Sequence, residues 1–149
     1  MQIVINETVI TLANVPFTLM RPVLYTVSIT NAHNSVRITA LDTMFGAVSA
    51  KAAEMSLTGL EFASGIPGSI GGAVVMNAGA YGGEMKDVVT SVTVLTKDGE
   101  IKKLSGEEMN FRYRGSVVED EDYIVLEAVM ELKEGNLEEI QDRMAELTL

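Results

Sequence analysis

The sequence predicts an α+β fold in which an antiparallel or mixed sheet is covered by packed helices. Two observations lead to this prediction. Strand-like and helix-like segments alternate without a regular βαβ repeat, and the pair Asp98-Gly99 indicates an antiparallel hairpin. The 149 residues fit one domain. We therefore expect a single compact domain overall.

The first part of the chain is rich in Val, Ile, Thr and Asn, a composition typical of short strands separated by polar turns. We expect strands at Gln2–Leu12, Pro22–Ile29 and Val36–Ala40. No glycine precedes Gly46. Residues 1–45 are therefore poorly suited to form a loop that cradles a phosphate.

A helix is expected at Met44–Met55, which is dense in Ala, Met and Val. Asp42 or Thr43 could cap its first turn. Its apolar positions spread around much of the helix, so we expect it to lie against a sheet. The segment Ser56–Gly59 should end it, because glycine is common just after a helix.

The next part of the chain is predicted to form a β-hairpin. Val88–Thr96 alternates as a strand does, Asp98-Gly99 predicts a two-residue turn, and Glu100–Leu104 should return. Ser105 and Glu108 have the spacing of a capping box, so we expect a short helix at Gly106–Asn110.

The C-terminal part contains one more strand and one more helix. Tyr123–Leu132 is expected to be a long strand. Asn136 is followed by Leu137, Ile140, Met144 and Leu147 at helical spacing, which predicts a helix that begins at Asn136.

Composition excludes several classes of site and partner. The formal net charge of −10 argues against a nucleic-acid partner, which would favour a basic surface. With no cysteine and one histidine, His33, thiolate and multi-histidine metal sites are excluded, and we predict no metal. No apolar run reaches the roughly 20 residues of a membrane span. Because the first positive side chain is Arg21, no secretory signal is recognised, and we expect a cytoplasmic protein.

The segment from Gly59 to Gly83 contains eight of the 13 glycines. The residues between them are largely apolar, such as Ile66, Ile70 and Val74, so the segment should be packed rather than serve as a linker. Backbone amides exposed in this way can bind a phosphate or the edge of a flat ring. The alternative is a packed turn and helix without a ligand. Neither a P-loop nor a G-x-G-x-x-G fingerprint is present.

The same segment, GLEFASGIPGSIGGAVVMNAGAYGG, resembles the signature of the UDP-N-acetylenolpyruvoylglucosamine reductase family. These flavoenzymes are built on the vanillyl-alcohol-oxidase (PCMH/VAO) type of FAD-binding domain. The similarity continues downstream through Phe111–Ser116 to the last helix and fades upstream around Val36. We therefore divide the chain into an unmatched strand-rich segment, 1–35, and an FAD-binding subdomain, 36–149.

The resemblance implies a flavin-dependent reductase of peptidoglycan precursor synthesis. NADPH reduces FAD, and the flavin reduces UDP-N-acetylglucosamine enolpyruvate to UDP-N-acetylmuramate. Arg114 matches the catalytic arginine that stabilises the substrate carboxylate, and Tyr113 would help to position the substrate. The residues that match the flavin-contacting part of the family are Gly65, Ile66, Pro67, Gly68, Ser69, Ile70, Gly71, Gly72, Ala73, Asn77, Ala78, Gly79 and Ala80.

Two features of the family have no counterpart in this sequence. One is the Gly-x-Gly-Ser-Asn loop that cradles the FAD diphosphate, and the other is a substrate domain beyond the position of Leu149, which carries a proton-donor serine. The chain thus resembles the middle part of such an enzyme, for which we expect weak FAD binding. The alternative function is a catalytically silent remnant that serves as a structural or self-associating module.

Two further expectations concern surfaces. The nearly uncharged, strand-like residues 1–40 offer poor protection against edge pairing, so we predict a homo-oligomer, most simply a dimer. Without the family resemblance, Arg114 would be interpreted as a solvated ion-pair partner of the acidic run Glu119–Asp122. That run itself is expected to be a solvated loop and not a metal site.

Overall fold

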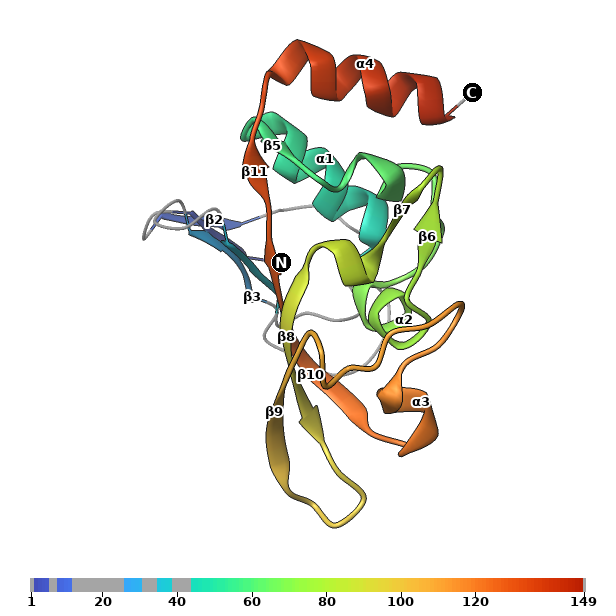
Figure 1. Cartoon of the computed structure of the whole chain (residues 1–149). Coiled ribbons are helices and arrows are strands. Elements are labelled where there is room, and N and C mark those ends of the chain that lie inside the picture. Colours follow the sequence, from blue (N-terminus) through green and yellow to red (C-terminus); the bar gives the residue numbers. More distant parts are fainter. Residues whose placement is uncertain (1, 6–7, 12–25, 31–34, 39–43, 149) are drawn as a thin grey trace.

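The computed structural model describes residues 2–5, 8–11, 26–30, 35–38 and 44–148, with side chains from Met44 onward. Strands and helices are mixed as the sequence predicted, so the α+β class is confirmed. The main feature is one seven-stranded sheet, with helices packed on it (Figure 1). Among the described residues, no helix is long and apolar enough to cross a membrane.

The N-terminal strands are β1 (Gln2–Ile5), β2 (Thr8–Thr11), β3 (Thr26–Thr30) and β4 (Ser35–Ile38). The expectation of one strand over Gln2–Leu12 is wrong, because β1 and β2 pair with each other in antiparallel register. The sequence between them, Asn6-Glu7, contains a residue common in turns. The expected strands at Pro22–Ile29 and Val36–Ala40 are confirmed in part as β3 and β4, and residues 22–25 and 39–40 lie outside the described part.

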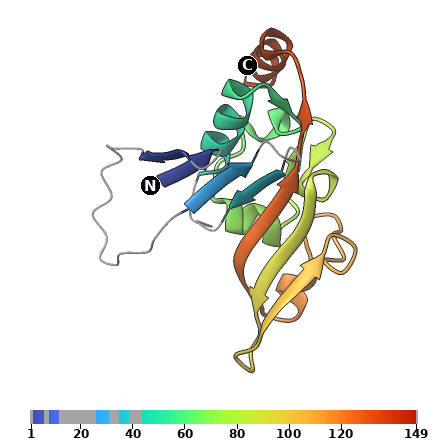
Figure 2. The ribbon, with the colours of Figure 1, turned by 90° about the vertical axis from the view of Figure 1, so that its left-hand side faces the viewer.

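The seven strands follow the order β2-β1-β3-β4-β10-β8-β9, where β8 is Val89–Leu95, β9 is Ile101–Ser105 and β10 is Ile124–Glu131. All neighbours are antiparallel except β1 and β3, so the predicted mixed sheet is confirmed. Figure 2 shows the sheet extending from the blue N-terminal strands to the yellow and orange strands. Because β4 pairs with β10, the N-terminal strands share a sheet with the rest; the proposed division at residue 35 stays a prediction.

The β8–β9 hairpin has a three-residue loop instead of the expected two. The amide of Thr96 donates to the carbonyl oxygen of Glu100 (2.8 Å), and the amide of Gly99 donates to that of Thr96 (3.0 Å). Only Gly99 in this loop adopts a positive φ, 81°. A type I′ turn needs positive φ at both central residues, whereas a longer turn with one left-handed glycine does not.

The capping box at Ser105 forms, but the helix expected after it does not. The amide of Ser105 donates to Oε2 of Glu108 (2.7 Å), and the amide of Glu108 donates to Oγ of Ser105 (3.2 Å). Residues 106–110 form a hydrogen-bonded turn that ends at Asn110, with φ of 46°. The predicted helix at Gly106–Asn110 is therefore wrong, because the chain leaves the helical region after one turn.

Helix α1 (Phe45–Glu54) buries a single face, formed by Phe45, Val48, Ser49, Ala52 and Ala53. Although its apolar positions spread around the helix, Ala47 and Ala50 are exposed, and the buried face joins the same core cluster as strands β8 and β10 of the sheet. Its N-cap residue is Met44, not Asp42 or Thr43, which lie outside the described residues. The first amide, that of Phe45, donates instead to the carbonyl oxygen of Gly68 (2.9 Å).

Helix α4 (Leu137–Thr148) lies over α1 (Figure 1), and the two helices are in contact. Oδ1 of Asn136 accepts from the amides of Glu138 (2.9 Å) and Glu139 (3.3 Å), so the predicted start is confirmed. Ile140 and Leu147 are buried as expected, whereas Leu137 is exposed. Helix α1 also contacts β5 (Leu57–Thr58) and the 3-10 helix η2 (Glu61–Ala63). Strand β5 pairs with β11 (Lys133–Glu134).

The core lies on one face of β8 and β10. Val92, Val94, Ala128 and Met130 are fully buried and alternate with less buried positions along the two strands. They belong to one cluster with the helical residues Phe45, Ile70 and Val74. This one-sided burial explains why both strands were recognisable from their period-two pattern.

Candidate functional site

Two hollows lie beside the glycine-rich segment, and its residues divide between them. The apolar hollow, of about 230 Å³, is lined by Phe45, Ile66, Pro67, Gly68, Ser69, Gly72, Ala73, Met76 and Ala78. The polar hollow, of about 270 Å³, is lined by Asn77, Gly79, Ala80, Tyr81, Gly82, Gly83, Glu84, Tyr113 and Arg114. Residues 76–79 thus alternate between the two, because Met76 and Ala78 line the first while Asn77 and Gly79 line the second.

Most of the residues that were expected to bind a cofactor are divided between the two hollows. Seven of them line the apolar hollow, and Asn77, Gly79 and Ala80 line the polar hollow together with the expected substrate residues Tyr113 and Arg114. Gly65, Ile70 and Gly71 are outside both linings. The side chain of Ile70 is fully buried in the core, so only its backbone could meet a ligand.

One wall of the apolar hollow is the short helix α2 (Ile70–Val75). Its N-cap is Ser69, whose Oγ accepts from the amide of Gly72 (3.3 Å). Gly72 is exposed on the helix and has an ordinary helical φ, and a Cβ there would lie 3.5 Å from Oγ of Ser69, an ordinary contact. Packing among the described residues therefore does not require a glycine at position 72.

The wall of the polar hollow is the two-stranded ribbon of β6 (Gly79–Ala80) and β7 (Gly83–Glu84). Here packing does require glycine. A Cβ at Gly79 would lie 2.6 Å from Cβ of Glu84, and a Cβ at Gly83 would lie 2.7 Å from the ring of Phe62. The ribbon can therefore lie close to η2 only because both positions lack a side chain.

The buried side chain of Asn77 makes hydrogen bonds to three other residues around the polar hollow. It is 2% exposed and adopts φ of 43°. Its Nδ2 donates to Oε2 of Glu84 (2.6 Å) and to the carbonyl oxygen of Arg112 (3.1 Å), while its Oδ1 accepts from the amide of Lys86 (2.9 Å). Both amide hydrogens are thus used within the chain, and a direct contact of this side chain with a cofactor stays a prediction.

Tyr113 and Arg114 form the tip of a tight turn over the polar hollow. Arg112 and Gly115 exchange both backbone hydrogen bonds across it, at 3.0 and 3.3 Å. Tyr113 is 88% exposed, and the guanidinium of Arg114 lies 5.5 Å from the centre of its ring. Nη1 of Arg114 donates to the carbonyl oxygen of Gly79 (3.2 Å). Among the described residues, no carboxylate forms an ion pair with this guanidinium, so it could meet an anion in the hollow.

The alternative for Arg114, an ion pair with the run Glu119–Asp122, is wrong for the described residues. Asp120 and Glu119 contact Arg112, and Asp122 pairs with Lys97. Glu119 and Asp120 belong to the one-turn helix α3 (Val117–Asp120) and are exposed. No group of three or more His, Cys, Asp or Glu in the described part of the chain is arranged to hold a metal ion.

Three residues of the site were missed in the sequence: Tyr81, Glu84 and Arg112. Tyr81 is 63% exposed at the rim of the polar hollow. Glu84 pairs with Lys86 and begins the 3-10 helix η3 (Met85–Asp87) with a capping box that includes Asp87. The spacing Glu84-x-x-Asp87, typical of a capping box, was the only local sequence signal for these three residues. Their contacts with the rest of the site join residues that are distant in sequence.

The Glu84 carboxylate is held in its charged form. The hydrogen bond from Lys86 is the main reason that the pKa of Glu84 lies below its usual value of 4.5, and the amide of Asn77 and the charge of Arg114 act in the same direction. A carboxylate therefore faces the polar hollow beside Arg114 at neutral pH.

This pKa shift predicts how stability depends on pH. Because the folded-state pKa of Glu84 is lowered, its contribution to stability is present above pH 4.5 and is lost as the pH falls toward the folded-state value. Urea unfolding at several pH values should show Glu84→Gln less stable than the wild type at pH 7. The difference should shrink below pH 4.5. A difference that stays constant with pH would contradict the assignment.

Comparison with known proteins decides the family. A family described as FAD binding domain matches residues 26–105, which include the whole apolar hollow and the β6–β7 ribbon. The chain belongs to this FAD-binding domain family. The predicted family resemblance is confirmed for the part of the chain that is matched.

Two relatives of this FAD-binding domain carry the same name. The UDP-N-acetylenolpyruvoylglucosamine reductase of Agathobacter rectalis is 60% identical over 104 residues, which cover 70% of this chain and 33% of that protein. The enzyme of the same name from Clostridioides difficile is 50% identical over 115 residues, 76% of this chain and 38% of its own length. The chain thus spans about a third of the length of these relatives.

A solved structure agrees with the fold of this FAD-binding domain. The crystal structure of UDP-N-acetylenolpyruvylglucosamine reductase from Thermus caldophilus has 36% sequence identity and a TM-score of 0.68. The match covers 82% of this chain and 47% of that chain. The fold of this chain is therefore similar to that of part of a reductase.

Proposed function

We propose that this chain forms the flavin-binding wall and the anion-binding arginine of a UDP-N-acetylenolpyruvoylglucosamine reductase. The reaction would be the NADPH-dependent reduction of UDP-N-acetylglucosamine enolpyruvate to UDP-N-acetylmuramate, a step of peptidoglycan precursor synthesis. The observation that carries the proposal is the position of the apolar hollow and the Arg114 hollow on two sides of the same short segment, residues 76–79.

The lining of the apolar hollow fits a flavin ring. Ile66, Pro67, Ala73 and Met76 offer an apolar surface, and Gly72 leaves the backbone of α2 open to close approach. A flat, mostly apolar ring favours such a wall. FAD supplies hydride transfer when it is bound, and the protein supplies position and electrostatics. In the polar hollow, the guanidinium of Arg114 would bind the substrate carboxylate, with Tyr113 beside it.

The second candidate is a flavin-free structural or self-associating module. The observation in its favour is that residues 1–45 contain no glycine, so this segment does not itself supply a loop of the kind that cradles the FAD diphosphate in the family. The two candidates make different predictions for flavin binding. A cytoplasmic location and a homo-oligomeric state are part of the proposal for either candidate.

The test is a titration of the chain with FAD and with riboflavin, followed by quenching of flavin fluorescence. We expect weak binding with similar affinity for both flavins, because the hollow meets the ring that they share. NADPH oxidation is then measured with and without the enolpyruvyl sugar, and stimulation by the sugar supports the reductase. Absence of quenching by either flavin would favour the structural module. Stoichiometric FAD that survives gel filtration would overturn the expectation of weak binding.

Gly72→Ala separates packing from ligand binding. Because Gly72 is helical and its Cβ would have room, alanine should raise the free energy of unfolding by about 0.5 kcal/mol. The added methyl group should weaken flavin binding, since Gly72 lines the hollow. Thermal unfolding and the same fluorescence titration measure the two effects. Unchanged flavin affinity would remove α2 from the proposed flavin wall.

A further inference from the structure

The turn that presents Arg114 is held in an unfavourable backbone conformation. Arg114 adopts φ of 54°, in the left-handed region where a side chain is disfavoured and glycine is usual. Its neighbour Gly115 is the glycine of this turn, but it has no positive φ. Contacts outside the turn must therefore hold it in place.

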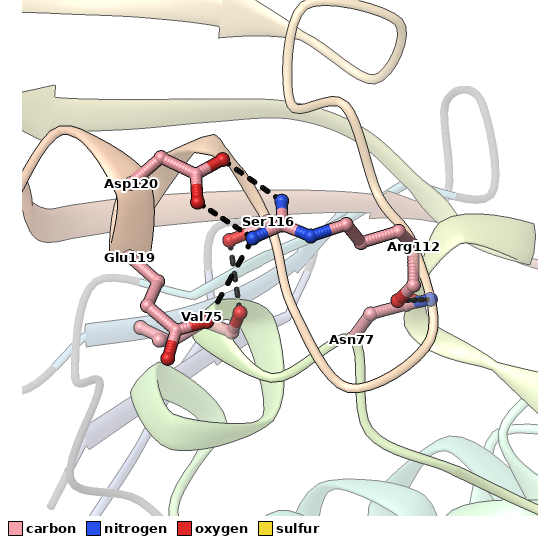
Figure 3. A network of polar contacts seen from close by, with 6 residues as sticks. All are labelled: Val75, Asn77, Arg112, Ser116, Glu119 and Asp120. Atoms are coloured by element: carbon pink, nitrogen blue, oxygen red, sulfur yellow. Dashed lines mark hydrogen bonds and ion pairs between the residues drawn. The ribbon is translucent and has the colours of Figure 1, made fainter.

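Those contacts converge on Arg112 (Figure 3). Its guanidinium makes a two-pronged pair with Asp120 of α3, with Nη1–Oδ2 of 2.9 Å and Nη2–Oδ1 of 2.6 Å, and its Nη2 is 4.0 Å from Glu119. Its carbonyl oxygen accepts from the buried amide of Asn77. A Cβ at Gly115 would lie 3.1 Å from the guanidinium, so glycine at 115 lets Arg112 fold across its own turn.

The start of α3 is fixed to α2 beside this pair. Ser116 is fully buried, and its hydroxyl donates to the carbonyl oxygen of Val75 (2.9 Å), as Figure 3 shows. Asp120 therefore has a defined position from which it can hold Arg112. Two acidic side chains of α3, Glu119 and Asp120, form ion pairs with Arg112 and not with Arg114, which is only two residues from Arg112 in the sequence.

We propose that Arg112 is a positioning residue for Arg114. Its pair with Asp120 holds the Tyr113–Arg114 turn over the polar hollow and keeps the carboxylates of α3 from capturing the Arg114 guanidinium. Arg114 then stays available for the substrate anion. This inference rests on the proposed function only in the identity of that anion.

The Arg112–Asp120 ion pair is better suited to orienting the turn than to stabilising the fold. The side chains of Arg112 and Asp120 are each 45% exposed, and ion pairs exposed to that extent contribute little to folding. A planar fork bound to a carboxylate by two bonds nevertheless fixes a direction. Loss of Arg112 should thus alter ligand binding while the melting temperature hardly changes.

The test measures binding of UDP-N-acetylglucosamine enolpyruvate to the whole chain by calorimetry. Arg112→Ala is expected to weaken binding about tenfold, by analogy with the loss of outer residues that orient metal ligands. Arg112→Lys should recover part of the loss. Adding Asp120→Asn and Glu119→Gln to Arg112→Ala should also recover part of it, because neither of these two α3 carboxylates is then left to capture Arg114. A plain loss of packing would not be rescued in this way.

The matched control is Arg143→Ala, which removes an exposed pair with Glu146 (Nη1–Oε2, 3.0 Å) on α4 and should leave binding unchanged. If Arg112→Ala behaves like this control, or the added substitutions recover nothing, the inference is overturned. If Arg114→Ala binds the sugar as well as the wild type, the proposed function fails instead. The inference is then decided by the Nε–Hε NMR signal of Arg114, which should shift in Arg112→Ala and return in the rescued variant; an unmoved signal would overturn it.

Discussion

Gly79→Ala is expected to destabilise the fold by about 3 kcal/mol, the upper end of what forced overpacking costs. The new Cβ would lie 2.6 Å from Cβ of Glu84 and 2.7 Å from the carbonyl oxygen of Gly83. Both atoms belong to the paired strand β7, so neither can move without opening the ribbon. Urea unfolding followed by circular dichroism measures the loss.

The matched control for this prediction is Gly65→Ala. Within the described part of the chain, a Cβ at Gly65 would meet only the carbonyl oxygen of Leu147, at an ordinary 3.6 Å, and Gly65 has no positive φ. We expect its stability to stay within about 0.5 kcal/mol of the wild type. If the two substitutions had equal effects, the close approach of β6 and β7 would not be the reason for glycine at position 79.

Long elements with a clear period could be predicted from the sequence. The strands β8 and β10 and the helix α4 each bury a repeating set of residues, such as Val92 and Val94 or Ile140 and Leu147. The local pattern and the tertiary burial agree in these cases, which makes the pattern informative. The cap at Asn136 also depends only on nearby amides.

Elements that depend on distant contacts could not be predicted. The first amide of α1 donates to the carbonyl oxygen of Gly68, more than twenty residues away, and the N-cap is Met44 instead of the predicted Asp42 or Thr43. The capping box at Ser105 formed without a helix, because the chain turns at Asn110. Short pieces such as α2, α3 and the β6–β7 ribbon contain too few residues for a period to be visible.

Contacts between residues that are distant in sequence also explain why parts of the candidate site could not be predicted. Family resemblance identified residues of both hollows, but it could not divide them, because the division depends on alternation along residues 76–79. Arg112 and Asn77 are 35 residues apart in sequence and meet only in the folded chain. Glycine roles also differ in ways that the sequence does not reveal, since Gly79 is required by packing and Gly72 is not.

In turnover of the enolpyruvyl sugar, Arg114→Ala is expected to lower kcat by about 10²–10³-fold, the usual loss when one donor to developing negative charge is removed. The guanidinium of Arg114 lines the polar hollow and, among the described residues, its hydrogen bond goes to a backbone carbonyl oxygen and not to a carboxylate. It can therefore meet a substrate carboxylate as charge grows there. Steady-state kinetics with NADPH and the sugar measure the change.

The two half-reactions separate this role from a structural one. Reduction of the flavin by NADPH builds no charge on the substrate carboxylate, so Arg114→Ala should affect that step much less in single-turnover experiments. Arg114→Lys should recover only part of kcat, because an ammonium group cannot reproduce the planar fork of a guanidinium. If Arg114→Ala slowed both half-reactions equally and unfolded the protein, Arg114 would be structural. If kcat stayed near normal and stability changed by only about 0–1 kcal/mol, Arg114 would be an ordinary exposed cation.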